Sequence, residues 1–226
     1  MNTAEFLTIA SAIVPDRTAV IFEGKRCSFA EISEKANRLA NALLDLGIEK
    51  QARVGIIQVN CNQYVEIYNA LAKIGAIMVP LNFRVKSNEL SYMLNNGETQ
   101  ALFVGDRYLD MVRGMQPELT TVKHYVSIDS KQEDMLSYED LLTGASPEEV
   151  SRDIDDEDVT ILMYTAGTTG WPKGVPLTHN GFVSYMLSNV EPANLDVSEV
   201  NTLTVPLYHV AGIQAMLAAS YGGRTL

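Results

Sequence analysis

Short apolar runs recur along the first two-thirds of the chain, and polar turns separate them. The run Arg53–Val59 is almost continuously apolar, as expected for a strand buried on both faces of a parallel sheet. Short runs of this kind predict strands rather than helices. The strands predicted in this way are Thr18–Phe22, Cys27–Phe29, Arg53–Val59, Ala76–Val79, Ala101–Val104 and Val122–Ile128.

The segments between these runs have the periodicity of amphipathic helices. The apolar positions after Ser28 are spaced three and four apart, so they share one helix face: Ile32, Ala36, Leu39, Leu43 and Leu46. Ser28 and Glu31 form a capping-box pattern at the start of this helix. Further helices are predicted at Tyr64–Ile74, Ser87–Leu94, Tyr108–Met115 (capped by Asp106) and Met135–Leu142. The alternation predicts an α/β fold, doubly wound, with largely parallel sheets and helices on both faces.

The chain changes character between Thr143 and Asp158, where acidic residues gather at Asp153 and at 155–158. Paired carboxylates can bind a metal or exchange protons. A charge run of this kind is more typical of a solvated loop, so we predict no metal site. We therefore expect a first α/β region at 1–142, an acidic connecting loop at 143–158, and the start of a second α/β region at 159–226. In this last part, strands are predicted at Val159–Tyr164 and Asn201–Val205, and helices at Gly181–Val190 and Val210–Tyr221.

Composition narrows the functional class. The 226 residues carry a formal net charge of −11, which disfavours nucleic acid and anionic membrane surfaces as partners. Hydrophobic residues make up 46% of the chain, the mean hydropathy is +0.01, and no apolar run approaches a membrane span, so a soluble globular protein is expected. The two cysteines, Cys27 and Cys61, lie in different segments, and a reducing, cytoplasmic compartment is the expected location.

Two polar features have both structural and functional interpretations. Asn60, Cys61 and Asn62 follow a predicted buried strand, at the end where open α/β sheets bind ligands. A helix cap or a turn is the more common role of such asparagines. His179 lies at the start of a predicted helix, where a capping or packing role is favoured over a catalytic one.

A glycine- and threonine-rich segment follows the strand Val159–Tyr164. Gly167, Gly170 and Gly174 allow the backbone to bend and to approach a ligand, and backbone N–H groups in such a turn can bind an anion. Lys173 adds a positive charge. The segment is not a Walker P-loop, because Pro172 rather than glycine precedes the lysine. The Gly/Thr content alone fits a contact with a polyphosphate and a glycine-rich turn with a chance lysine about equally well. The proposed phosphate-binding set is Thr165, Ala166, Gly167, Thr168, Thr169, Gly170 and Lys173.

The string from Tyr164 to Val175, Tyr-Thr-Ala-Gly-Thr-Thr-Gly-Trp-Pro-Lys-Gly-Val, resembles the phosphate-binding signature of the acyl-adenylate-forming enzymes. That superfamily includes acyl-CoA synthetases, adenylation domains of peptide synthetases and firefly luciferase. Ala166 stands where the family usually has serine. A second segment, Val205 to Gly212, is similar to the family's Pro-Leu-Phe-His-x-x-Gly motif. Two matches in the right order argue against chance similarity. The resemblance covers the whole chain, with weaker support before Asp158.

The resemblance implies a role for each motif. The phosphate segment would bind ATP, and the aromatic–histidine pair Tyr208-His209 would border the pocket for the carboxylic acid. His209 would orient the carboxylate or gate its tunnel rather than act as a nucleophile, and Tyr208 would supply an apolar wall. From the residues alone, a structural role is the more common one for a histidine such as His209.

The resemblance also implies a reaction: a carboxylate and Mg-ATP give acyl-AMP and pyrophosphate, and coenzyme A then accepts the acyl group. The main Mg²⁺ ligand, a ribose-binding aspartate and a small C-terminal domain with a catalytic lysine are expected outside these 226 residues. The chain would then be an incomplete N-terminal portion of the large adenylating domain, inactive alone. Another acceptor, such as a carrier-protein pantetheine or oxygen in a luciferase-like reaction, and a catalytically dead nucleotide-binding module both stay open, as does a homodimer.

Overall fold

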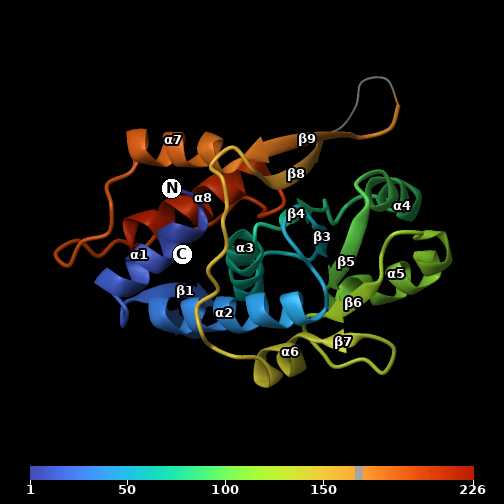
Figure 1. Ribbon diagram of the computed structural model, residues 1–226, viewed down its shortest axis with the longest axis horizontal. Helices are drawn as coiled ribbons and strands as arrows, with labels where there is room; N and C mark the ends of the chain where they lie inside the picture. Colours follow the sequence, from blue (N-terminus) through green and yellow to red (C-terminus); the bar gives the residue numbers. More distant parts are fainter. Residues whose placement is uncertain (166–169) are drawn as a thin grey trace.

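The computed structural model describes residues 1–165 and 170–226, which form an α/β fold around a seven-stranded sheet (Figure 1). The strand order is β7-β6-β5-β3-β4-β8-β9, and every neighbouring pair is parallel except β8 and β9. The strands are β3 (Arg53–Ile57), β4 (Ile77–Pro80), β5 (Thr99–Val104), β6 (His124–Ser127), β7 (Leu136–Ser137), β8 (Val159–Thr165) and β9 (Lys173–Thr178). The strand after the acidic segment, β8, therefore joins the same sheet as the strands before it.

Helices cover both faces of this sheet, as the alternation of elements predicts. Successive side chains of β5 point to opposite faces: Phe103 packs in the core under α2 and α3, and Leu102 packs in the core under α4 and α5. The first face carries α1 (Ala4–Ile13), α2 (Phe29–Asp45), α3 (Asn62–Ile74), α6 (Tyr138–Gly144), α7 (His179–Asn189) and α8 (Val210–Gly222). The second face carries α4 (Ser87–Asn96) and α5 (Leu109–Met115), with single 3₁₀ turns at Asp106–Tyr108 and Gln116–Glu118.

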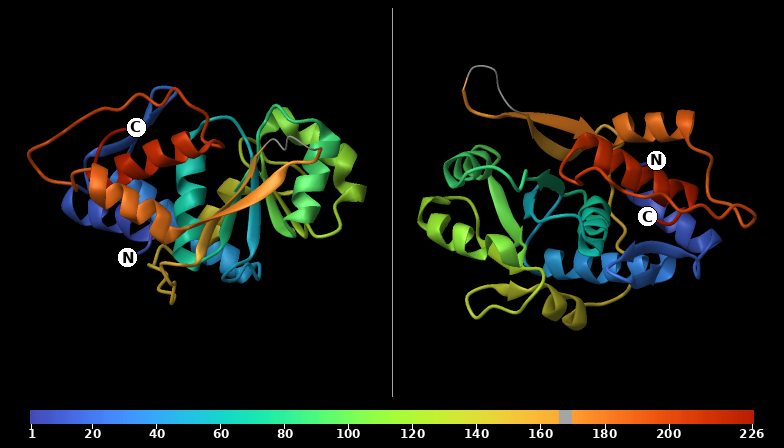
Figure 2. Two further views of the ribbon diagram at one scale, coloured as in Figure 1. Left: turned by 90° about the horizontal axis from the view of Figure 1, so that it is seen from above. Right: turned by 180° about the vertical axis from the view of Figure 1, so that it is seen from behind.

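A small antiparallel hairpin lies beside α1, and both chain ends lie at this side of the molecule (Figures 1 and 2). It consists of β1 (Thr18–Phe22) and β2 (Lys25–Ser28), joined by a turn in which Glu23 and Gly24 both have positive φ. Leu226 adds to its edge: its N–H donates to Ala19 O, and its carbonyl accepts from Ile21 N, both at 2.8 Å.

Several local predictions are confirmed. Ser28 accepts a hydrogen bond from Glu31 N at 3.2 Å, and the Glu31 carboxylate accepts from Ser28 N at 2.7 Å, which is the capping box at the start of α2. Gly75 ends α3 with a left-handed φ of 70°, as expected for a C-terminal glycine. His179 is 1% exposed, and its Nδ1 accepts a hydrogen bond from Thr3 N, so its role is packing.

Other local predictions are wrong. Asn201–Val205 is not a strand, and in this part of the chain only Val200 forms a bridge, with Thr225. The predicted helix Met135–Leu142 is a short strand, Leu136–Ser137, followed by a helix that begins at Tyr138. Asp106 starts a 3₁₀ turn and does not cap α5. The return strand of the hairpin is Lys25–Ser28 rather than Cys27–Phe29.

The acidic segment is a loop fastened to the core at two points. Lys50 Nζ lies 2.7 Å from Asp158 Oδ2, and the buried Lys73 Nζ lies 3.0 Å from Glu149 Oε1. Over residues 1–165 and 170–226, no group of three or more histidine, cysteine or acidic side chains has the arrangement of a metal site. Among the same residues, no helix has the length and apolar character needed to cross a membrane.

Candidate functional site

The two predicted motifs meet at the carboxyl edge of the sheet. Because β8 is parallel to β4, both strands end at this edge, where open α/β sheets bind ligands. A cavity of about 550 Å³ lies there. Its wall includes the end of β4, the end of β8, the start of α4 and the start of α8, through Pro80, Asn82, Arg84, Glu89, Met93, Met163, Thr165, Pro172, Tyr208 and His209.

The phosphate segment connects β8 to β9, so it is the tip of a hairpin. Thr165 pairs with Lys173 at the last step of the ladder, and Thr165 Oγ1 donates to Lys173 O at 3.4 Å. Ala166, Gly167, Thr168 and Thr169 lie outside the described residues. Gly170 has a φ of 131°, which a residue with a Cβ rarely adopts, and this explains a glycine there. The Lys173 side chain is exposed and forms no ion pair within the described part of the chain.

Helix α4 packs against the two ends of the phosphate segment, through contacts that the sequence did not predict. The indole of Trp171 stacks on the Tyr92 ring, with centroids 4.8 Å apart and an interplanar angle of 26°. One residue before the hairpin tip, Tyr164 donates its hydroxyl to Asn96 Oδ1 at 3.0 Å. Burial raises the pKa of Tyr164 to about 12, so this hydroxyl stays protonated near neutral pH and serves as a structural donor.

His209 stands at the junction of the second motif and α8. It is the N-cap residue, and its Nδ1 accepts a hydrogen bond from Ala211 N at 3.3 Å. A neutral imidazole that accepts at Nδ1 carries its proton at Nε2. Nε2–H is therefore a donor, on a side chain that lines the cavity. The neighbouring Tyr208 ring packs edge-on against Phe83, with centroids 5.0 Å apart.

The glycine of the second motif has a steric reason. A Cβ on Gly212 would lie 2.2 Å from the carbonyl oxygen of Pro206. Only glycine allows the first turn of α8 to sit this close to the preceding turn of the chain. The glycine of the motif is therefore explained by the close approach of Gly212 to Pro206 O. His209 N also donates to Pro206 O at 3.1 Å, which closes the turn.

Asn60 has a role that differs from the cap or turn favoured by its sequence. The N-cap residue of α3 is Cys61, and its side chain forms no capping hydrogen bond with the described residues. Asn60 instead bonds to the backbone of the second motif: its Nδ2 donates to Val205 O at 2.9 Å, and its Oδ1 accepts from Leu207 N at 2.8 Å. Its position after a strand was noted from the sequence, but its partners, about 145 residues away, were not.

A second buried polar group lies away from the cavity, between α2, α3 and α6. The fully buried carboxylate of Glu66 accepts hydrogen bonds from the Tyr138 hydroxyl and from Asn62 Nδ2, and Lys35 Nζ lies 3.3 Å from it. Because the charge is hydrogen-bonded and paired, its burial is accounted for by the structure. We assign it to the core rather than to the site.

The chain is similar to known proteins over nearly its whole length. Residues 8–226 match the family described as "AMP-binding enzyme". A 3-oxocholest-4-en-26-oate–CoA ligase of Rhodococcus rhodochrous is 37% identical over 185 residues, which cover 79% of this chain and 33% of that protein. A long-chain-fatty-acid–CoA ligase of Thermus thermophilus is 32% identical over 217 residues, 93% of this chain and 40% of that protein.

Solved structures give the same result. A structure described as a putative long-chain-fatty-acid CoA ligase, from Rhodopseudomonas palustris, superposes with a TM-score of 0.88 at 28% identity, covering 100% of this chain and 56% of that one. An anthranilate CoA ligase in complex with anthranoyl-AMP gives a TM-score of 0.93 at 25% identity, covering 100% of this chain and 44% of that one. The chain spans about a third of the length of the curated relatives it matches, such as the Rhodococcus rhodochrous ligase. It belongs to the AMP-binding enzyme family.

Proposed function

We propose that the protein containing this chain is an ATP-dependent carboxylic acid–CoA ligase that forms acyl-AMP and then acyl-CoA. The observation that carries the proposal is the single cavity bordered by the base of the phosphate segment (Thr165 and Pro172) and by Tyr208 and His209. A polyphosphate held at the first border and a carboxylate at the second would meet inside it. The residues 1–226 would be part of the large N-terminal domain of such an enzyme, with a small C-terminal domain in addition.

The phosphate segment would act electrostatically on the leaving group. In the first step a carboxylate oxygen attacks the α-phosphorus of ATP, and the bond from that phosphorus to the bridging oxygen breaks to release pyrophosphate. Thr165, the Gly170 backbone and Lys173 would hold the β and γ phosphates, together with the proposed residues outside the described part, Ala166, Gly167, Thr168 and Thr169. A preorganised donor of this kind contributes about 2.7–4 kcal/mol to a transition state.

His209 would hold the acid rather than attack it. Its Nε2–H can donate to a carboxylate oxygen, while its Nδ1 is occupied by Ala211 N. The Tyr208 ring, fixed by Phe83, would form the apolar wall beside the acyl group. Relatives are named for fatty and steroid acids, which supports a hydrophobic carboxylic acid as the substrate.

The remaining requirements are proposals about the whole protein. Mg²⁺ would accompany ATP, with its main ligand outside this chain, because the described residues offer no acidic cluster at the cavity. Coenzyme A would be the acceptor thiol, and a carrier-protein pantetheine is the alternative acceptor. We place the enzyme in the cytoplasm on its cysteine content, with a homodimer as an open alternative to a monomer.

The test is ATP–pyrophosphate exchange, measured on the protein encoded by the complete gene with a panel of fatty, steroid and aromatic acids. Lys173→Ala should slow exchange by about 10²-fold or more, since it removes one donor to the leaving group. Lys123→Ala is the matched control, because Lys123 is also exposed but lies at the amino end of β6, opposite the cavity edge.

Equal exchange rates in wild type and Lys173→Ala would refute the role of this lysine. ATP binding without exchange for any acid would refute the ligase and favour a nucleotide-binding module. With exchange established, product analysis with coenzyme A then separates the two acceptors.

A further inference from the structure

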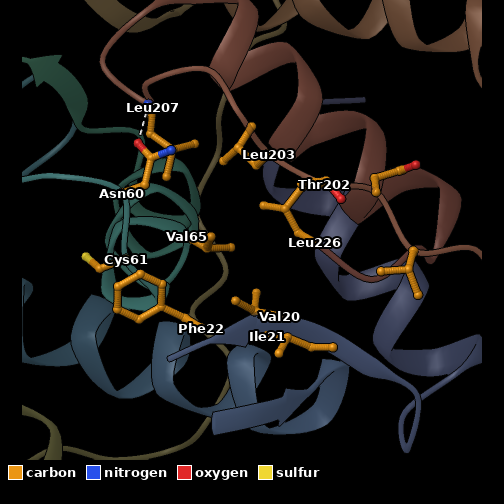
Figure 3. Close-up of a pocket in the computed structure, with 12 residues that line it drawn as sticks. Val20, Ile21, Phe22, Asn60, Cys61, Val65, Thr202, Leu203, Leu207 and Leu226 are labelled. Carbon is orange, nitrogen blue, oxygen red and sulfur yellow. Dashed lines mark hydrogen bonds between the residues drawn. The ribbon is translucent and has the colours of Figure 1, made fainter. Parts of the chain in front are cut away.

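Asn60 occupies the place of a missing strand partner beside the second motif. It follows β3 by three residues, and Figure 3 shows its side chain directed at the backbone of Leu207, at the margin of an apolar cavity that is distinct from the site cavity. Its amide donates to Val205 O and its carbonyl accepts from Leu207 N, at 2.9 and 2.8 Å. These two backbone groups flank Pro206, as they would face a residue of a parallel neighbouring strand.

Pro206 does not prevent this pairing. In an extended segment, Val205 O and Leu207 N point to one side and the N–H that proline lacks would point to the other, so both groups that face Asn60 are available. A carboxamide carries a donor and an acceptor in one plane, and it satisfies both neighbours of the proline at once. Within the described residues, Asn60 is the only hydrogen-bond partner of the backbone between Thr202 and Val205.

The position fixed by Asn60 determines where the second motif enters the cavity. Leu207, which donates to Asn60, is 2% exposed and immediately precedes Tyr208. The carbonyl of Pro206 accepts from His209 N, and His209 then starts α8. Tyr208 and His209 directly follow this segment, and His209 N is also hydrogen-bonded to Pro206 O. A displacement of Val205–Leu207 would therefore displace both cavity residues.

We propose that Asn60 is a positioning residue for Tyr208 and His209. Its two hydrogen bonds hold the Val205–Leu207 segment at the distance at which His209 reaches the cavity. The assignment rests on the proposed function for the kinetic part of its test, and on the geometry alone for the spectroscopic part.

The test compares Asn60→Ala with Asn41→Ala. Asn41 is a matched control, because its Nδ2 donates to the carbonyls of Asn37, Ser146 and Glu148, each at 3.0 Å, and so also fixes a distant loop. Exchange is measured on the complete protein with dodecanoate as the probe acid. Asn60→Ala should lower kcat by about 10²-fold, as a misplacement near 1 Å does, with the KM for ATP nearly unchanged. Asn41→Ala should keep the wild-type kcat.

The second readout does not depend on activity. This chain has three histidines, so the ¹⁵N–¹H signals of their imidazoles can be resolved and assigned. Asn60→Ala should shift the signals of His209 and leave those of His124 and His179 in place. Asn60→Asp, which keeps the acceptor for Leu207 N and loses the donor to Val205 O, should give a smaller shift and serves if the alanine variant does not fold.

The outcomes are separable. If wild-type protein shows no exchange with dodecanoate or the wider panel, the proposed ligase fails and the spectra alone decide the role of Asn60. Unchanged His209 signals in both Asn60 variants overturn the proposal. So does an equal fall of kcat in Asn60→Ala and Asn41→Ala, because that pattern reports a general loss of stability.

Discussion

A methyl group on Gly212 should disturb the site more than its size suggests. The Cβ of an alanine there would lie 2.2 Å from Pro206 O and 2.9 Å from Leu207 Cα. Both are backbone atoms, so no side-chain rotation can relieve the contact. Ordinary van der Waals contact begins at about 3.4 Å, and the turn must therefore move away from α8 by about 1 Å.

This displacement has an energetic and a positional consequence. Forcing an extra methyl group into a packed site costs about 1–3 kcal/mol. The turn that must move leads directly into Tyr208 and His209, and a misplacement of about 1 Å lowers a catalytic rate by about 10²-fold. We expect Gly212→Ala to lower the free energy of unfolding of this chain by that amount and to slow ATP–pyrophosphate exchange in the complete protein.

Urea unfolding followed by circular dichroism measures the first effect, and the exchange assay measures the second. Gly114→Ala is the control: Gly114 lies inside α5, and a Cβ there would meet no atom within 4 Å. Alanine at this position should stabilise the helix by about 0.5–1 kcal/mol, because glycine is the poorer helix former. A Gly212→Ala protein with wild-type stability and wild-type exchange would refute the steric account of the motif.

Three further predictions concern other parts of the fold. Tyr138→Phe removes a donor to a buried carboxylate and should cost about 1.5–3 kcal/mol in urea unfolding, whereas Tyr64→Phe should cost nothing, because this hydroxyl has no hydrogen-bond partner within the described residues; equal losses would contradict the assignment. Burial lowers the pKa of His179 from 6.5 to about 4, so its contribution to stability is complete above pH 6.5 and is lost as the pH falls through 4. His179→Gln should therefore remove up to about 3 kcal/mol of the pH dependence of unfolding in that window, and an unchanged dependence would place the titration elsewhere. Trp171 is the single tryptophan, and Tyr92→Ala should shift its fluorescence emission to longer wavelength by opening the stack to water; an unchanged spectrum would argue against the contact.

Much of the fold can be predicted from local sequence patterns, and the predictions that failed did so for identifiable physical reasons. The parallel strands except β7 were predicted, because burial on both faces demands continuous apolar runs, whereas the two residues of β7 lie in a segment predicted as a helix. Strand β9 was missed because Gly174 and Pro176 interrupt its signal, yet both are tolerated in the edge strand that it forms. Asn201–Val205 failed for the opposite reason: its residues favour an extended strand, but over this range the described structure supplies no neighbouring strand.

The candidate site likewise has a part that the sequence predicts and a part that it does not. Its two motifs lie in continuous stretches of sequence, so a chain-order inspection finds Thr165, Gly170, Lys173, Tyr208 and His209. Their supports are tertiary contacts between distant segments. No local pattern near residue 60 indicates a bond to residue 205, and none near residue 92 indicates a stack on residue 171.

The local charge at the cavity differs from the net charge of the chain. A protein with a net charge of −11 repels ATP at long range, so binding needs positive potential concentrated at short range. The cavity wall carries Arg84 together with Glu89, and α8 begins beside it with the positive end of its helix dipole at His209. Lys173 pairs with Thr165, which lines the cavity, and adds a positive charge nearby. These contributions act within a few ångströms, where solvent ions screen little, whereas the repulsion of the distant acidic groups is screened beyond about 8 Å at physiological salt. An acidic surface and the anion-binding role that we propose for the cavity are thus compatible in one chain, because the two effects operate over different distances.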